Sequence, residues 1–176
     1  LFKDVYEFAG EFRKVDFSKH ERILNNDSVS YGDHKLLEQS LDYDITLEKN
    51  KNYKEMNIVD VINNITDFSS RIWQIHPFRE GNGRSTRIWL DHILKEELNK
   101  VIDWTKIDKQ SYLNAMIDSP IDDTKIKELL KTSLTSDINN RDIYLRGIDQ
   151  SYYFEDLNEY TLSTNRIAKR SQNGCH

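Results

Sequence analysis

The hydrophobic pattern of the chain is that of a mainly helical protein. Between residues 54 and 75, apolar side chains recur at intervals of three and four positions, as on the buried face of a helix: Ile58, Val61, Ile62, Ile65, Phe68, Ile72 and Trp73. Pro77 stops this pattern, because proline cannot continue an α-helix. Similar spacing predicts helices over residues 1–9, 35–49, 83–99, 108–118 and 122–146. We therefore expect an all-α fold.

Two glycines mark the expected ends of helices, and an aspartate marks the expected start of a last helix. Gly10 follows the first predicted helix and is a natural stop. Gly147 is expected to end the helix over 122–146, and Asp149 to cap a last helix with the sequence "QSYYFEDLNEY".

One segment departs from helical periodicity. Residues 25–34 read "NNDSVSYGDH", in which "SVSY" lies between turn-forming residues. The segment is the best strand candidate in the chain, so we expect a short β-hairpin within residues 24–34.

Composition limits the class of protein. The length of 176 residues suits one domain with a real core, and the net charge of −5 creates no general attraction to nucleic acid or to anionic membranes. Cys175 is the single cysteine, so no intrachain disulfide can form. No apolar run is long enough for a membrane span. We expect a cytoplasmic protein, with native sequence preceding Leu1, since the chain starts without Met inside a predicted helix.

The candidate chemistry lies in residues 76–84, "HPFREGNGR", between two predicted helices. A helix start presents backbone N–H groups and the positive end of the helix dipole, and therefore binds phosphates. Gly81 and Gly83 leave room for such an anion and permit positive φ. Asn82 can donate an amide hydrogen bond, while Arg84 and Arg87 share a helix face and can bind further phosphates.

Two further residue types in this loop suit phosphoryl chemistry. Glu80 offers a hard oxygen ligand, and Mg²⁺ bound by one carboxylate plus phosphate oxygens is common at nucleotide sites. The histidine side chain ordinarily titrates near neutrality, which suits His76 to act as a base toward an attacking hydroxyl. Pro77 and Phe78 are expected to be the structural anchor of the histidine, with Phe78 buried below the loop.

Each of these features also has a simpler interpretation. A histidine before proline is usually a helix-end residue, "GNG" is usually a turn, and two arginines usually form a solvated face. The coincidence of all of them in one helix–loop–helix favours a functional site.

The nine residues resemble the signature of the Fic family, H-P-F-x-[D/E]-G-N-G-R, at every specified position, and Arg87 matches the family's second arginine. The opening "LFKDVYEFAGEFRKVDFSK" is similar to the segment that precedes this motif in the family. The resemblance covers residues 1–130 in pattern. It implies a Fic fold, with a helical core and a β-hairpin flap over the active site, and transfer of AMP from ATP to a protein hydroxyl.

The resemblance also implies a role for each residue of the motif. His76 is the base, Glu80 holds Mg²⁺, the backbone of 81–83 forms an anion hole, and Arg84 and Arg87 bind the β- and γ-phosphates. The related Doc toxins carry Lys at the position of Gly83 and act as kinases, so Gly83 favours adenylylation. The flap strand, Ser28, Val29, Ser30 and Tyr31, is expected to pair with an extended segment of the target protein.

A second resemblance lies near the C-terminus. "SYYFED" at 151–156 is similar to the inhibitory motif [S/T]-x-x-x-E-[G/N] of autoinhibited Fic proteins, with Asp156 in place of Gly or Asn. By this resemblance Glu155 pairs with Arg87 and competes with the γ-phosphate, and Ser151, one turn earlier, steadies Glu155. The alternative is an ordinary amphipathic helix with Glu155 in solvent.

Together these interpretations divide the chain into a catalytic core over 1–147, an inhibitory helix over 148–162 and a tail over 163–176. The expected activity is that of a protein adenylyltransferase, with ATP as co-substrate, Mg²⁺ as cofactor and an unidentified protein as substrate. The alternatives are removal of AMP from modified proteins and a nucleotide-binding regulator without turnover. No nucleic-acid or membrane partner is expected, and association into homo-oligomers is left open.

Overall fold

The computed structural model describes residues 3–4, 6–16, 18–20 and 28–154, and every structural statement below refers to these residues. They contain the following α-helices: α1 Leu37–Lys49, α2 Ile58–Ile75, α3 Asn82–Leu98, α4 Lys109–Asp118, α5 Thr124–Ser133 and α6 Arg141–Phe154. Short 3-10 helices lie at η2 His34–Leu36, η3 Tyr53–Glu55 and η4 Trp104–Lys106. None of the described helices combines the length and the apolar character that crossing a bilayer requires.

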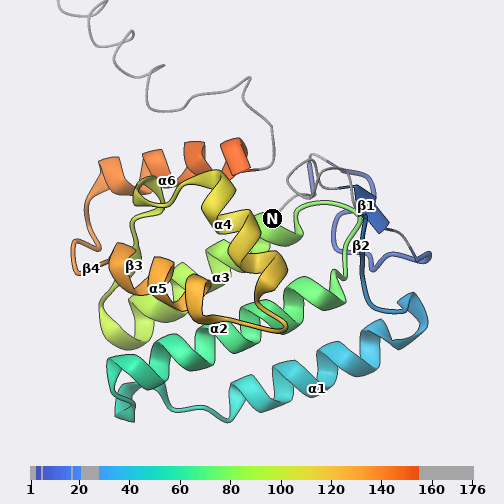
Figure 1. Ribbon diagram of the computed structural model, residues 1–176, viewed down its shortest axis with the longest axis horizontal. Helices are drawn as coiled ribbons and strands as arrows, with labels where there is room; N and C mark the ends of the chain where they lie inside the picture. The colour runs from blue at the N-terminus through green and yellow to red at the C-terminus, as the bar shows by residue number, and fades with distance from the viewer. Residues whose placement is uncertain (1–2, 5, 17, 21–27, 155–176) are drawn as a thin grey trace, which may run out of the picture.

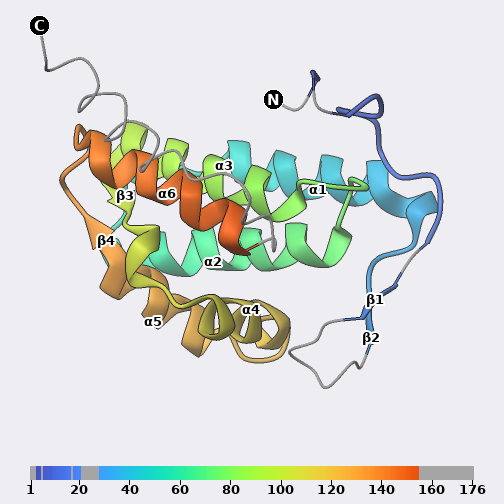
Figure 2. The same cartoon turned by 90° about the horizontal axis from the view of Figure 1, so that it is seen from above.

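Helix α2 is the central element of the fold. Asn57 caps its N-terminus, because the Asn57 side chain accepts hydrogen bonds from the backbone N–H groups of Val59 and Asp60. Helix α1 runs beside α2, α3 packs on it next to the site, and α4 and α5 cover another face, as Figures 1 and 2 show. Val61 and Ile65 of α2 are completely buried. The predicted apolar face is therefore confirmed over Val61–Phe68, whereas Ile72 and Trp73 are half-buried and Ile58 at the helix start is 37% exposed.

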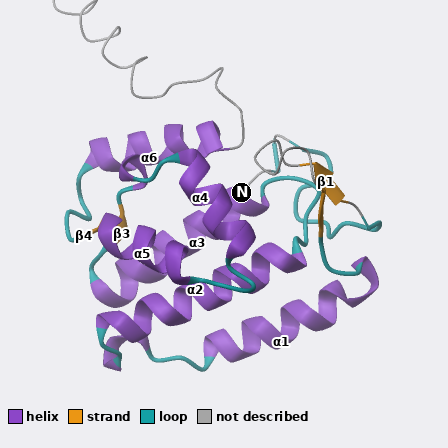
Figure 3. Ribbon diagram, in the orientation of Figure 1, coloured by secondary structure: helices purple, strands orange, loops and turns teal. Residues whose placement is uncertain are grey.

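The hairpin that the sequence predicts is present. Strand β1 Ser18–His20 pairs antiparallel with β2 Ser28–Ser30, with Lys19 opposite Val29. The predicted strand is thus confirmed over 28–30, and its partner lies earlier in the chain than the expected range of 24–34. Figure 3 shows this hairpin at one end of the helical body. A second pair, β3 Val101–Ile102 with β4 Leu134–Thr135, was not predicted, because two residues show no periodicity.

The predicted single helix over 122–146 is wrong. Helix α5 ends at Ser133, β4 follows, and α6 begins only at Arg141. The Asn140 side chain accepts hydrogen bonds from the backbone N–H groups of Asp142 and Ile143, so Asn140 acts as the cap that starts α6.

The predicted helix end at Gly147 is also wrong, as is the expected cap at Asp149, because both residues lie within α6. A Cβ atom on Gly147 would lie 3.5 Å from the Trp104 ring. That distance is an ordinary van der Waals contact, so Gly147 neither ends the helix nor is required by its packing on Trp104. The boundary that we expected between residues 147 and 148 falls in the middle of a continuous helix.

The predicted helix over 1–9 is not observed in the described part of that segment, where residues 3–4 and 7–10 form turns. Gly10 has a φ of +87° at the end of these turns, so its expected role as a helix stop is wrong. A segment of nine residues is too short to be stable as a helix without packing partners.

Candidate functional site

His76 lies at the C-terminal end of α2 in the left-handed region, with φ 48° and ψ 62°. Its backbone N–H donates to the carbonyl of Ile72 at 3.0 Å, which completes the last turn of the helix. The imidazole stacks on the ring of Tyr31, with the two ring centroids 3.8 Å apart. Tyr31 directly follows the flap strand β2, so the fold brings the candidate base and the flap together.

Arg13 is a residue of the site that the sequence analysis missed. Only 2% of Arg13 is exposed, and its guanidinium donates to the carbonyls of His76 at 2.9 Å, Ile75 at 3.2 Å and Gly32. Its backbone N–H also donates to the carbonyl of Pro77 at 2.9 Å. One side chain thus connects the N-terminal segment, the flap and the candidate base. The only signal in the sequence was a basic residue between Phe12 and Val15.

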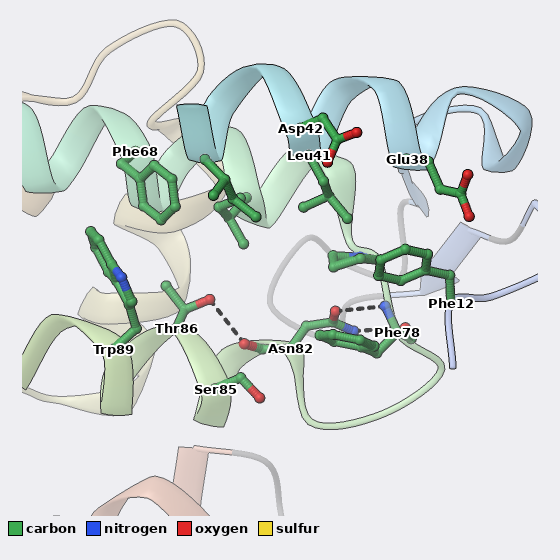
Figure 4. A pocket seen from close by; sticks show the side chains of 13 residues that line it. Phe12, Glu38, Leu41, Asp42, Phe68, Phe78, Asn82, Ser85, Thr86 and Trp89 are labelled. Carbon is green, nitrogen blue, oxygen red and sulfur yellow. Dashed lines mark hydrogen bonds between the residues drawn. The ribbon is translucent and has the colours of Figure 1, made fainter. Parts of the chain in front are cut away.

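The loop after His76 is closed by Asn82. The Asn82 side chain accepts a hydrogen bond from the backbone N–H of Phe78 at 2.9 Å and donates to the Phe78 carbonyl at 2.8 Å, as Figure 4 shows. These bonds use one of its two amide hydrogens, so the second can still donate to an anion. Pro77 is buried, whereas Phe78 is only half-buried, against Phe12. The main visible role of Asn82 is therefore to hold the shape of the loop.

The two glycines play different parts. Gly81 has a φ of +82° and immediately precedes α3, whose first hydrogen bond runs from the Ser85 N–H to the Gly81 carbonyl. Gly83 lies inside the first turn of α3, so the positive φ expected there is wrong. The missing side chain at Gly83 instead keeps the helix start open. By position, the N–H groups of Asn82 and Gly83 have no acceptor within the helix and can bind an anion.

Arg84 and Arg87 are both buried on α3, with 5% and 3% of their surface exposed. A guanidinium nitrogen of Arg84 lies 3.8 Å from the carboxylate of Glu80 and 3.3 Å from the hydroxyl of Tyr6. The Glu80 side chain itself is 54% exposed. The site therefore has a carboxylate at its open edge and two arginines behind it.

The last turn of α6 covers both arginines. Arg87 donates from Nε to the Ser151 hydroxyl at 3.0 Å, and from a terminal nitrogen to the same hydroxyl at 2.9 Å and to the Ser151 carbonyl at 3.2 Å. Its guanidinium also lies over the ring of Phe154, and that of Arg84 over the ring of Tyr152. Residues 64 positions apart in the sequence thus meet at the candidate phosphate-binding face.

Asp91 supports the surface on which α6 lies. Its carboxylate accepts hydrogen bonds from the Trp104 indole at 2.7 Å and from the Ile102 N–H at 2.9 Å. Desolvation raises the pKa of Asp91 to about 6, against the lowering effect of these bonds and of Arg87. Trp104 in turn meets Phe154 edge to face, with centroids 6.4 Å apart. The carboxylate therefore orients the ring against which the end of α6 packs.

Two cavities adjoin the loop. One of about 390 Å³ is lined by Tyr6, Phe8, Phe78, Glu80 and Ser85 among others, and opens at the candidate metal ligand. The other, of about 580 Å³, lies between α1, α2 and the start of α3, as Figure 4 shows. Its lining is largely apolar, so the first cavity is better suited to a charged ligand.

The residues that the sequence singled out therefore converge at the α2–α3 corner. His76, Glu80, Gly81, Asn82, Gly83, Arg84 and Arg87 occupy one loop and the first turns of α3. Ser151 reaches this corner from α6, and Tyr31 from the flap. Ser28, Val29 and Ser30 form β2, whereas Glu155 lies outside the described residues.

Comparison with curated proteins identifies relatives of this corner and of the rest of the chain. The chain is 30% identical over 155 residues, or 85% of its length, to protein adenylyltransferase VbhT of Bartonella schoenbuchensis, and covers 30% of that protein. It is 27% identical over 105 residues to a protein adenylyltransferase of Bartonella henselae, with 54% of this chain and 19% of that protein covered. The chain thus spans less than a third of these relatives.

Solved structures share the fold. The Fic domain of a putative cell filamentation protein from Bartonella quintana superposes with a TM-score of 0.61 at 21% identity, over 76% of this chain and 66% of that one. BepC of Bartonella tribocorum, solved with bound AMPPNP, gives 0.59 at 19% identity, over 74% and 67%. The predicted all-α Fic fold is thus confirmed. Residues 1–94 match the model of the Fic/DOC family, and the chain belongs to this family.

Proposed function

We propose that this chain carries the catalytic site of a protein adenylyltransferase, which transfers AMP from ATP to a hydroxyl of a target protein. The observation that carries the proposal is the corner in which one short loop joins His76, at the end of α2, to the open N-terminus of α3 with its two buried arginines. A base and a phosphate site are thereby held at a fixed separation. The names of the curated relatives support the same activity.

The residues of the corner suit the parts of this reaction. The N–H groups at the start of α3 and the arginines hold the phosphates of ATP. His76 accepts the proton of the target hydroxyl, whose oxygen then forms a bond to the α-phosphorus. The bond from the α-phosphorus to the bridging oxygen breaks, and pyrophosphate leaves. The negative charge of the transition state lies mainly on the phosphate oxygens. Positioning of the reactants and electrostatic stabilisation therefore account for most of the rate acceleration.

The donor set also suits Mg²⁺. Glu80 is a half-exposed carboxylate beside the helix start, and Mg²⁺ typically takes one or two carboxylates together with phosphate oxygens. Mg²⁺, when bound, neutralises developing charge on the phosphates. Arg84, 3.8 Å from Glu80, keeps this carboxylate near the phosphate site.

The finer part of the proposal is autoinhibition by α6. The Ser151 hydroxyl and carbonyl occupy the Arg87 guanidinium, and Tyr152 lies on Arg84. A γ-phosphate that needs Arg87 must displace these contacts. Glu155, directly after the described end of α6, adds a carboxylate for which Arg87 is the proposed partner. Release of this turn is therefore expected to activate the enzyme.

The test compares five proteins: the parent, His76→Asn, Glu155→Gly, Ser151→Ala and Tyr144→Ala. Tyr144 is 69% exposed on the same helix, so its variant is the matched control for changes in α6. Each protein is incubated with ATP labelled at the α-phosphate and Mg²⁺ in a cell lysate, and label on protein is measured. A parallel incubation with ATP labelled at the γ-phosphate detects kinase activity.

We expect more α-label on protein with Glu155→Gly and Ser151→Ala than with the parent and Tyr144→Ala, and none above that of the lysate alone with His76→Asn. The γ-label should not exceed that of the lysate without added protein, which carries its own kinases. Equal labelling by parent and Glu155→Gly would refute the inhibitory role while leaving the transferase intact. Absence of α-label with every protein, despite measurable ATP binding, would refute the transferase. Release of AMP from a previously modified protein would then identify AMP removal, and its absence a regulator.

A further inference from the structure

The end of α2 poses a local problem that the motif itself does not solve. His76 adopts a left-handed conformation, which is uncommon for residues other than glycine although asparagine, aspartate and histidine adopt it more often than the rest. In addition, the last carbonyls of a helix receive no hydrogen bond from an N–H group of the helix itself, so they need donors from elsewhere. The geometry of His76 must therefore be held by groups outside its own loop.

Those groups come from the N-terminal segment and from the flap. The Gly32 N–H donates to the Gln74 carbonyl at 2.9 Å, and the Arg13 guanidinium donates to the carbonyls of Ile75 and His76. A cation at this end of a helix also interacts favourably with the helix dipole. Arg13 thus fulfils the role that a C-terminal glycine or lysine has in other helices.

The same guanidinium holds the flap. It donates to the Gly32 carbonyl, to the Val15 carbonyl at 2.8 Å and to the Asp16 carboxylate at 3.3 Å. Gly32 is the residue after Tyr31, whose ring stacks on the imidazole of His76. Arg13 therefore acts on the imidazole by two routes. It binds the backbone of His76, and it binds Gly32, which adjoins the Tyr31 ring that stacks on the imidazole.

We infer that Arg13 is a positioning residue for the base, which sets the orientation of the His76 imidazole by binding its main chain and the adjoining flap in one buried guanidinium. Arg13 touches neither the candidate phosphate site nor the target hydroxyl, and acts through His76 and Tyr31. The planar, forked guanidinium is needed because its donors must reach several carbonyls in different directions. A lysine keeps the charge but has one nitrogen centre, so it cannot maintain both sides.

The first test is spectroscopic and needs no activity. A stacked aromatic ring moves the resonances of the His76 imidazole upfield, so the imidazole signals of the parent are assigned with His76→Asn and with Tyr31→Leu, which removes the ring. We expect Arg13→Lys to shift the His76 signals toward their positions in Tyr31→Leu. His92, on the exposed side of α3, supplies the reference signal.

The matched control is Arg71→Lys. Arg71 lies on the same helix, and its Nε donates to the Asp44 carboxylate of α1 at 2.6 Å, remote from the loop. Arg71→Lys loses arginine contacts within α2, the helix that ends at His76, but none of these contacts is to His76. The His76 signals are therefore expected to stay in place even where the thermal stability of this variant falls. His76 signals that stay in place in Arg13→Lys, or move equally in both variants, would show that Arg13 is merely structural.

The second test is kinetic and rests on the proposed function. With Glu155→Gly as the active background, Arg13→Lys is expected to lower the maximal rate of α-label transfer by about 10- to 100-fold. The ATP concentration for half-maximal rate should change little, because Arg13 does not contact the start of α3. A raised ATP requirement at an unchanged maximal rate would overturn the inference. If no protein transfers label, the proposed function fails, and the spectroscopic test still decides the role of Arg13.

Discussion

Asp91 gives the most quantitative prediction, because its carboxylate is partly buried, has a raised pKa and orients Trp104. The perturbation is Asp91→Asn, which removes the titrating group and preserves its shape. Desolvation raises the pKa of Asp91 from the ordinary value of 3.8 to about 6. The folded state therefore binds more protons than the unfolded state between these values. The Asp91 contribution to the free energy of unfolding is thus fully present below pH 3.8 and is lost as the pH rises through 6.

The magnitude follows from the shift. A difference of about 2.2 pKa units at about 1.36 kcal/mol per unit gives a total of about 3 kcal/mol. About 2 kcal/mol of this lies between about pH 4.5 and about pH 7.5, where the protein can be studied without acid denaturation. The stability of the parent minus that of Asp91→Asn should fall by this amount across the interval, because all other groups titrate alike in both proteins.

The assay is urea unfolding followed by far-ultraviolet circular dichroism at several pH values. Trp104→Phe is the internal check, since losing the indole donor should raise the pKa of Asp91 further and steepen the fall in the parent but not in Asp91→Asn. A stability difference that is independent of pH, or that grows with pH, would refute the reasoning. The first result would mean that the carboxylate is solvated, and the second that its hydrogen bonds outweigh desolvation.

Three further changes test other parts of the structure. Gly81→Ala places a Cβ on a residue with φ +82° and should cost about 1–2 kcal/mol in urea unfolding, with weaker ADP binding by calorimetry; unchanged binding would show that the loop does not hold phosphate. Phe154→Ala removes a ring that is 4% exposed and stacks on Tyr112, and should cost about 3–5 kcal/mol unless the end of α6 detaches. In that case limited proteolysis should cut after residue 140 faster than in the parent, and no change in either measurement would contradict the packing described. Tyr53→Phe removes the donor to one oxygen of the buried Glu48 carboxylate and leaves Lys51 as its remaining partner, so it should lower the unfolding free energy by about 1–3 kcal/mol, whereas a neutral effect would mean that water replaces the hydroxyl.

The sequence predicted those parts of the fold that local pattern determines. Helix α2 has a regular apolar face and an asparagine cap, so its position could be predicted within a few residues. The loop from His76 to Arg84 was predicted to be the site because its residue types suit phosphate binding, metal binding and proton transfer next to a helix start. The strand at Ser28–Ser30 followed from its turn-forming neighbours.

Features that depend on tertiary contacts were missed. Gly147 looks like a helix stop in sequence, but in the fold it is the point where α6 passes Trp104. The break between α5 and α6 depends on the pairing of β3 with β4, whose strands are 32 or more residues apart. Arg13 could not be singled out because most of its acceptors are backbone carbonyls, which every residue carries. Only the folded structure shows which carbonyls lie within its reach.

The left-handed backbone of His76 has a consequence for how this site can be lost. Among the amino acids that a single nucleotide change can put in place of histidine are asparagine and aspartate, the non-glycine residues that tolerate this conformation best. Either replacement removes the imidazole and leaves the helix end unstrained. Descendants of this gene can therefore lose the proposed base in one mutational step and still fold with the proposed phosphate site unchanged, whereas most other replacements of His76 also destabilise the protein.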